Sequence, residues 1–199
     1  MRLFHFSDDP AITLFEPRPV RVPAERRPGY DWLNGPLVWA IDEWHSMMYF
    51  FPRDCPRVLL WPKPGSTDED RRRWLGETSA RAVAYVETAW LGRLRSETIW
   101  RYDLLTETFE DLNDAGMWVS RQAVRPVAVE TLPPLDQCLA AADVELRPVD
   151  ELTFLKPVWD STLHASGIRL RNAIGWGEPG WPHTSDPAHP GERRDERGG

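Results

Sequence analysis

The chain has 199 residues, and 24 lysines and arginines against 31 aspartates and glutamates give it a formal charge of −7. At roughly 150 residues per domain, this length predicts one globular domain. Apolar residues make up 41% of the chain, enough for a core, which excludes wholesale disorder, collagen and coiled coils. The acidic balance argues against general nucleic-acid binding, because that requires a field that attracts phosphates.

The N-terminus and the cysteines indicate a cytoplasmic protein. No stretch approaches the about 18 consecutive apolar residues of a membrane span. The opening MRLFHFSDDP turns acidic before a signal-peptide core could form. Cys55 and Cys138 are too few for a disulfide framework or a cysteine-based zinc site. We expect reduced thiols, a cytoplasmic location and no membrane contact.

Hydrophobic patterns predict strands and helices in mixed order. Alternating, β-branched or aromatic runs predict strands over residues 2–6, 37–41, 57–61, 82–87, 98–104, 117–120 and 124–131. Amphipathic spacing and caps predict helices over residues 42–51, 67–76, 135–142 and 157–163, with Gly167 ending the last of them. Residues 168–171 permit either a strand or a helix. Without regular βαβ alternation, this mixture predicts an α+β fold with a mainly antiparallel sheet and short flanking helices.

Two stretches lack such patterns. Residues 17–36 hold five prolines and two glycines and predict a long loop with four arginines, namely Arg18, Arg21, Arg26 and Arg27. Loops of this length are usually functional or disordered, so this one is either a flap over an anionic ligand or a solvated surface loop. From Trp176 onward, proline, glycine and charge dominate. We expect one domain over residues 1–175 and a disordered tail over residues 176–199.

One candidate catalytic set lies on the helix predicted to begin at Asp42. His45 and Tyr49 follow at i+3 and i+7, which places all three side chains on one helical stripe. A carboxylate beside a histidine can orient its imidazole, so this set favours acid–base catalysis by a small hydrolase or isomerase. The alternative is an N-capping aspartate beside a surface histidine. No third ligand has a spacing that suits zinc, and we expect no metal site.

Eleven tryptophans and nineteen prolines also permit a non-catalytic module that binds a protein partner. This hypothesis predicts an exposed apolar patch that contains some of Trp32, Trp44, Trp61 and Trp74. If all four rings are buried, the hypothesis loses its support.

Three segments resemble a bacterial family of uncharacterised proteins: LFHFS, FPRDCPRV and GIRLRNA, within a match over about residues 1–173. The chain also resembles the opening of the ADP-ribosyltransferase fold. The shared features are an N-terminal strand with aromatic-His-x-Ser, an EPR segment, and a strand ending in aromatic-Ala before a helix. This second resemblance implies a partly split central sheet and a nucleotide cleft.

In that fold a strand histidine hydrogen-bonds the NAD ribose, an aromatic residue stacks on nicotinamide, and a late carboxylate assists transfer. The resemblance assigns the first role to His5, with Ser7 beside it, and the second to Trp39. The late strand carries Met117 instead of a carboxylate. The resemblance therefore implies that NAD or a related nucleotide binds in a cleft floored by His5 and Trp39, and implies catalysis less directly. On the residues alone, the favoured interpretation of His5 is a partly buried structural histidine.

Arginines are the candidate ligands for the phosphates of such a nucleotide, because guanidinium donors match phosphate oxygens. The candidates are Arg18 in the long loop and Arg169 and Arg171 in GIRLRNA. The last two, with Asn172, either close the anionic side of the site or clamp surface carboxylates, and the second interpretation is the favoured one.

Overall fold

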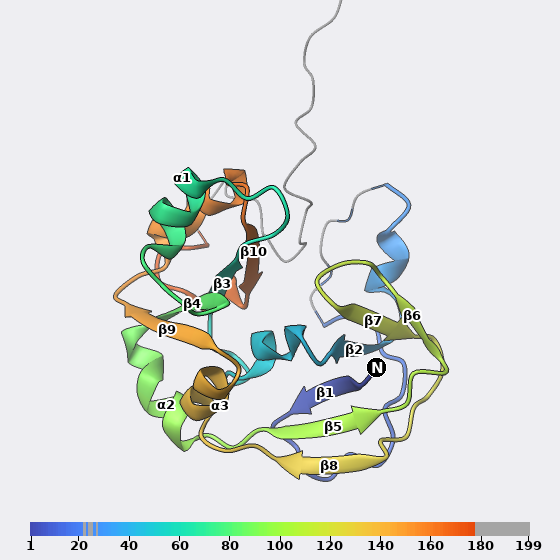
Figure 1. The fold of residues 1–199 in the computed structure, drawn as a ribbon. Coiled ribbons are helices and arrows are strands. Elements are labelled where there is room, and N and C mark those ends of the chain that lie inside the picture. The colour runs from blue at the N-terminus through green and yellow to red at the C-terminus, as the bar shows by residue number, and fades with distance from the viewer. Residues whose placement is uncertain (22, 24–25, 27, 178–199) are drawn as a thin grey trace, which may run out of the picture.

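The computed structural model describes residues 1–177 except 22, 24–25 and 27 (Figure 1). Within these residues the strands are β1 (Leu3–Ser7), β2 (Val38–Asp42), β3 (Arg57–Trp61), β4 (Ala82–Glu87), β5 (Trp100–Leu104), β6 (Phe109–Asp111), β7 (Met117–Ser120), β8 (Ala128–Thr131), β9 (Val144–Val149) and β10 (His164–Ile168). They form a six-stranded sheet, β6-β7-β2-β1-β5-β8, and a four-stranded sheet, β10-β3-β4-β9. Every pairing is antiparallel except β4 with β9. The expectation of an α+β fold with mainly antiparallel strands is confirmed.

The helices are short. They are α1 (Asp68–Asp70) with a π-helical turn over Arg71–Leu75, α2 (Leu91–Ser96), α3 (Leu135–Ala141), and 3₁₀ helices over Asp31–Asn34, His45–Tyr49, Thr88–Trp90, Thr153–Asp160 and Leu170–Asn172. The cap before α1 is confirmed, because Thr67 Oγ1 accepts the Asp70 N–H at 3.2 Å. Gly76 ends that helical segment with φ +63°, a conformation that glycine adopts without a Cβ clash.

The strands predicted at residues 57–61, 82–87 and 117–120 are confirmed at both ends. All residues of β3 and β4 are buried, which explains why these segments consist of continuous apolar runs rather than alternating ones. No strand is predicted above over β6 or β9, and of β10 only its last residue, Ile168, lies in a segment that permitted a strand. In β9 a parallel neighbour and the packed helix α3 stabilise a segment whose own pattern is weak.

Three helix predictions are wrong in detail. Asp42 is the last residue of β2, and the helix after it is a 3₁₀ segment that begins at His45. The helix around Pro157 is also 3₁₀ and ends at Asp160, before Leu163. Gly167 ends no helix, because it lies in β10 opposite Val58. A Cβ on Gly167 would approach Leu170 Cδ1 to 2.4 Å, so close packing rather than helix termination explains this glycine.

The apolar core extends over both faces of the four-stranded sheet. One cluster joins the two sheets and includes Phe4, Ile41, Leu59 and Trp61. A second cluster lies on the opposite face of β3 and β4 and includes Val58, Leu60 and the C-terminal residues up to Trp176. A third covers the side of β1 and β5 that faces away from the first cluster. The long 17–36 segment contributes Leu33 to a fourth, smaller cluster, with Tyr30 and Trp32 packed against it, and Arg18 forms an isolated bridge with Leu37.

The end of the folded region lies later than the sequence indicates. Trp176, assigned above to a disordered tail, is 2% exposed, and its ring packs edge-on against Trp159 with centroids 5.7 Å apart. Residues 178–199 of the expected tail lie outside the described residues, as does Arg27 in the long loop. Among the helices that are described, none is long and apolar enough to cross a membrane.

Trp176→Ala tests whether the last described residues belong to the core. Removing a buried indole costs about 3–5 kcal/mol of unfolding free energy, which lowers Tm by roughly 10 °C in a protein of this size. Ile174→Ala, at a side chain that is 54% exposed, should leave Tm almost unchanged. Equal Tm values for wild type and Trp176→Ala, measured by calorimetry, would contradict this assignment.

Candidate functional site

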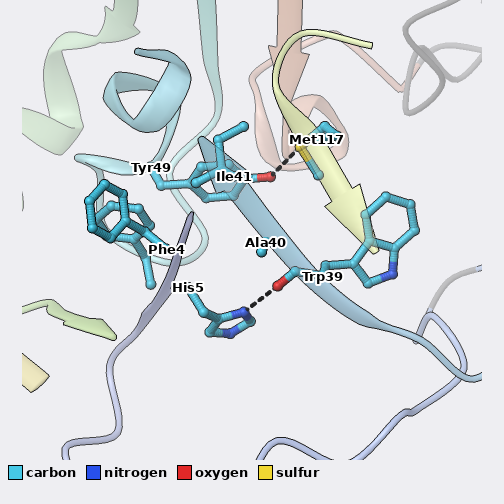
Figure 2. Close-up of a pocket in the computed structure, with 8 residues that line it drawn as sticks. Phe4, His5, Trp39, Ala40, Ile41, Tyr49 and Met117 are labelled. Carbon is cyan, nitrogen blue, oxygen red and sulfur yellow. Dashed lines mark hydrogen bonds between the residues drawn. The ribbon is translucent and has the colours of Figure 1, made fainter. Parts of the chain in front are cut away.

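The candidate site lies where β1 and β2 separate. These strands pair only at Leu3 with Asp42 and Phe4 with Ile41, whereas β1 pairs with β5 along its whole length. Beyond the pair of Phe4 with Ile41, the structure contains a cavity of about 60 Å³ that is partly open to solvent (Figure 2). The cavity is lined by residues of β1, β2, β7 and the 3₁₀ helix over His45–Tyr49. These residues are Phe4, His5, Phe6, Trp39, Ala40, Ile41, Tyr49 and Met117.

His5 bridges the two strands beyond the point where their backbone pairing ends. Its Nδ1–H donates to the Trp39 carbonyl at 2.9 Å, and its ring lies 4.6 Å from the Phe15 ring. Burial lowers the pKa of His5, the nearby charge of Arg53 lowers it further, and the hydrogen bond to Trp39 opposes both effects. His5 is therefore neutral at pH 7, with its lone pair on Nε2.

His5 and Trp39 both line the cavity, although their rings pack in different clusters. Regular pleating would direct the two side chains to opposite faces of the sheet, and the Trp39 ring does pack with Leu33, Leu37 and Val119. Both residues are part of the cavity lining. Figure 2 shows the Trp39 carbonyl directed at His5, whereas the Trp39 indole points away from His5. At about 60 Å³ the cavity is smaller than the roughly 300–1,000 Å³ of typical ligand pockets. It can hold one end of a ligand, but not a whole dinucleotide.

Tyr49 and Met117 form the opposite wall of the cavity. The Tyr49 ring stacks parallel to Phe6 with centroids 5.9 Å apart, and its hydroxyl donates to Met117 Sδ at 3.6 Å. Burial raises the pKa of Tyr49, so the phenol stays protonated at neutral pH. The transferase resemblance calls for a carboxylate on the late strand, and the thioether of Met117 lies on the cavity wall instead.

Asp42 and His45 form the predicted carboxylate–imidazole pair. The His45 Nδ1–H donates to both Asp42 oxygens, at 2.9 and 3.0 Å, and the His45 backbone N–H donates to Oδ1 at 2.8 Å. Burial acts to raise the pKa of Asp42, but the hydrogen bonds from His45 outweigh it and hold this pKa below its ordinary value. Gly116 covers the pair, and its φ of +72° and the lack of a side chain are both required, because a Cβ there would lie 2.3 Å from His45 Nδ1.

Tyr49 does not belong to this pair. A 3₁₀ helix has three residues per turn, so positions four apart no longer share a face. The Tyr49 hydroxyl points to Met117. The centre of the His45 ring, in contrast, lies 4.5 Å from that of Trp44 and 5.9 Å from that of Trp61. The predicted three-residue stripe is thus divided into an Asp42–His45 pair and a cavity-lining tyrosine.

The remaining candidate ligands lie apart from the cavity lining. Ser7 Oγ accepts the Asp9 N–H at 3.1 Å and caps the end of β1. The Arg18 side chain is 78% exposed beside Glu16. Arg169 Nε donates to the Arg53 carbonyl at 3.2 Å and lies 3.9 Å from Asp54. Arg171 is exposed.

The tryptophans named for a partner-binding patch differ in exposure. Trp61 and Trp74 are buried, Trp32 is partly buried, and only Trp44 is exposed, at 43%. Of these four tryptophans, only Trp44 therefore offers an exposed ring to a protein partner. Among the described residues, no group of three histidine, cysteine, aspartate or glutamate side chains could hold a metal ion.

Several residues that shape the site carry no functional signal in the sequence. The pattern around Phe6 indicates only a strand hydrophobe, although its ring stacks on Tyr49. Gly116 follows Asn113, Asp114 and Ala115, and this turn-forming run could have indicated a tight backbone approach. No sequence signal reveals that Arg57, within the apolar run of β3, is only 3% exposed.

Titration of His5 makes the stability of the fold depend on pH. Its pKa is lower in the folded than in the unfolded chain, so between the two values the unfolded chain binds more protons. The contribution of His5 to the free energy of unfolding is therefore complete above its ordinary pKa of 6.5. It is lost as the pH falls from 6.5 through the lower pKa that His5 has in the folded chain. Urea unfolding between about pH 7.5 and about pH 5.5 should show this loss in wild type. His5→Gln should flatten the slope, and an unchanged slope in His5→Gln would contradict this account.

Comparison with known proteins places the chain in a family without assigning an activity. The searches of curated proteins and of solved structures each found no match. The model of one family, a family of unknown function (DUF6886), matches residues 4–173, which include both strands of the cavity, the Asp42–His45 pair and the Arg169–Asn172 turn. The chain therefore belongs to the DUF6886 family.

Proposed function

We propose that this protein binds NAD or a related nucleotide, with the flat ring at one end of the ligand inserted in the cavity between β1 and β2. The observation that carries this proposal is the shared cavity of His5, Trp39, Tyr49 and Met117. These residues come from four segments, and three of them, His5, Trp39 and Met117, occupy positions that the resemblance to ADP-ribosyltransferases singles out.

The chemistry of the lining suits a planar ring with polar edges. Trp39, Tyr49 and Phe6 supply aromatic surface, and stacking on such surfaces accepts any flat heterocycle. His5 is held neutral with its Nε2 lone pair unprotonated, so it can accept a hydrogen bond from a sugar hydroxyl or an amide. Because the cavity measures only about 60 Å³, it accepts no more than the ring, and the rest of the nucleotide lies outside it.

The proposal is for binding rather than efficient transfer. Stabilisation of developing charge is usually the largest catalytic contribution, and Met117 offers a thioether where a carboxylate would be needed. The phenol of Tyr49 is protonated and buried, so it carries no negative charge to replace that carboxylate.

Calorimetric titration with NAD tests the proposal. Wild type should bind saturably, and Trp39→Ala should weaken binding by about tenfold, because loss of a base–aromatic stack costs on the order of 1–3 kcal/mol. Trp39→Phe should retain most of the affinity, whereas His5→Ala should reduce it.

Trp90→Ala is the matched control, because this ring is also partly buried but stacks with Arg93 and is not part of the cavity lining. It should bind NAD as wild type does. Absence of NAD binding to wild type, or equal weakening by Trp39→Ala and Trp90→Ala, would refute the proposal.

The Asp42–His45 pair supports a second candidate function, acid–base catalysis in a small hydrolase or isomerase. Asp42 fixes the Nδ1–H tautomer, so the lone pair of His45 lies on Nε2 and can accept a proton. The side chains of Asp42 and His45 are 21% and 22% exposed, which leaves the pair accessible from solvent.

Hydrolysis of p-nitrophenyl acetate tests this second function. If His45 is a general base, His45→Gln and Asp42→Asn should each lower the rate by about a hundredfold. His5→Gln, which removes a histidine from the other site, should not change the rate. A wild-type rate equal to that of His45→Gln would exclude the function.

A further inference from the structure

Two segments that are far apart in sequence meet at one end of the four-stranded sheet. Strand β10 pairs with β3, with Ile168 opposite Arg57. Just beyond these strands, the turn of Arg169–Asn172 lies against the loop before β3. Arg169 Nε donates to the Arg53 carbonyl at 3.2 Å, and Asn172 Nδ2 donates to the Asp54 carbonyl at 2.7 Å.

This contact brings four arginines together: Arg53, Arg57, Arg169 and Arg171, called here the arginine junction. Two carboxylates partly balance them, since Asp8 pairs with Arg53 and Asp54 lies 3.9 Å from Arg169. The junction thus carries an excess of positive charge in a chain whose formal charge is −7. The pKa of Arg169 is lowered by burial and further by the charges of Arg171 and Arg53, as expected for cations that repel one another.

Arg57 is the buried member of the junction. Its guanidinium donates to the Met48 carbonyl at 2.8 and 3.1 Å and to the Cys55 carbonyl at 3.0 Å. No carboxylate of the described residues lies within ion-pair distance of it. Burial of a charge is costly unless an opposite charge compensates it, so carbonyl dipoles alone leave a positive field in this region.

Arg169 and Arg171 differ in how they are held. Arg169 has φ +57°, a left-handed conformation that is uncommon outside glycine, and such strain clusters at functional positions. Its backbone conformation and its bond to Arg53 together fix where the guanidinium lies. Arg171 is exposed and makes no ion pair with the described residues, so its donors are available to a ligand.

The junction adjoins the cavity. The Arg57 guanidinium carbon lies 5.9 Å from the centre of the Tyr49 ring, which lines the cavity. Arg53 lies close enough to His5 to lower its pKa, and the same guanidinium pairs with Asp8 just after β1. The C-terminal end of β1 and the Tyr49 end of the 3₁₀ helix over His45–Tyr49 therefore lie between the cavity and the arginine junction.

We propose that the arginine junction binds the phosphate groups of the nucleotide whose ring enters the cavity, with Arg169 and Arg171 as the donors and Arg57 as the buried source of the field. This inference rests on the proposed function and specifies the ligand class, which is a phosphorylated nucleotide in preference to a nucleoside or a free base. Paired guanidinium donors match the oxygens of a diphosphate, and charge-assisted bonds are the stronger ones.

The test compares four probes by calorimetric titration at low and high salt: NAD, ADP-ribose, nicotinamide riboside and inorganic pyrophosphate. Arg171→Gln should weaken NAD and ADP-ribose by about five- to tenfold and reduce the salt dependence of their binding, because a charge-assisted phosphate contact is lost. Nicotinamide riboside, which lacks the diphosphate, should bind Arg171→Gln and wild type equally. Arg169→Gln should act in the same direction.

Arg72→Gln is the matched control, because Arg72 is an exposed arginine in the π-helical turn after α1. Equal effects of Arg171→Gln and Arg72→Gln on NAD would overturn the inference. If Trp39→Ala abolishes NAD binding while both junction variants bind normally, the cavity function stands and the junction is structural. If pyrophosphate and ADP-ribose bind through Arg171 while nicotinamide riboside does not bind, the junction stands and the ring cavity fails.

Discussion

The candidate site depends on the early end of the pairing between β1 and β2. Two residue pairs join these strands. Beyond these pairs, β1 pairs only with β5 and β2 pairs only with β7. A sheet that opens in this way leaves backbone groups without ladder partners, and the His5 imidazole donates to one of them, the Trp39 carbonyl. One side chain thus stabilises the opening, and the same opening creates the cavity. The cost is a partly buried histidine whose pKa is lowered by burial, so that it is neutral at pH 7.

The two sides of the site have opposite chemical character. The cavity wall is aromatic and aliphatic, whereas the arginine junction beside it is cationic in an otherwise acidic molecule. Tyr49 lies between them, stacked on Phe6 on one side and near the Arg57 guanidinium on the other. An apolar hollow next to a fixed positive charge suits a ligand with a flat ring and an anionic group, and it would disfavour a ligand that has only one of these features.

The Asp42–His45 pair shows how a turn can make a polar contact possible. Asp42 ends β2 and its backbone N–H donates to the Gly116 carbonyl at 2.9 Å, which brings the β6–β7 turn directly over the carboxylate. Only a residue without a Cβ leaves room there for the imidazole. Met117, the next residue, lines the cavity. The same turn therefore limits both candidate sites, although their side chains perform separate tasks.

By itself, the sequence determined the α+β class, the positions of the most apolar strands and the cap of α1. These features depend on local patterns: β3 and β4 are continuous apolar runs, and Thr67 lies three residues before Asp70. The resemblance also selected His5 and Trp39, which the cavity brings together. Only the tertiary structure decided that Asp42 ends a strand, that Tyr49 leaves the Asp42–His45 pair, that Trp176 packs in the core and that Arg57 is buried among carbonyls. Each of these outcomes depends on contacts between segments distant in the chain, and local periodicity carries no information about such contacts.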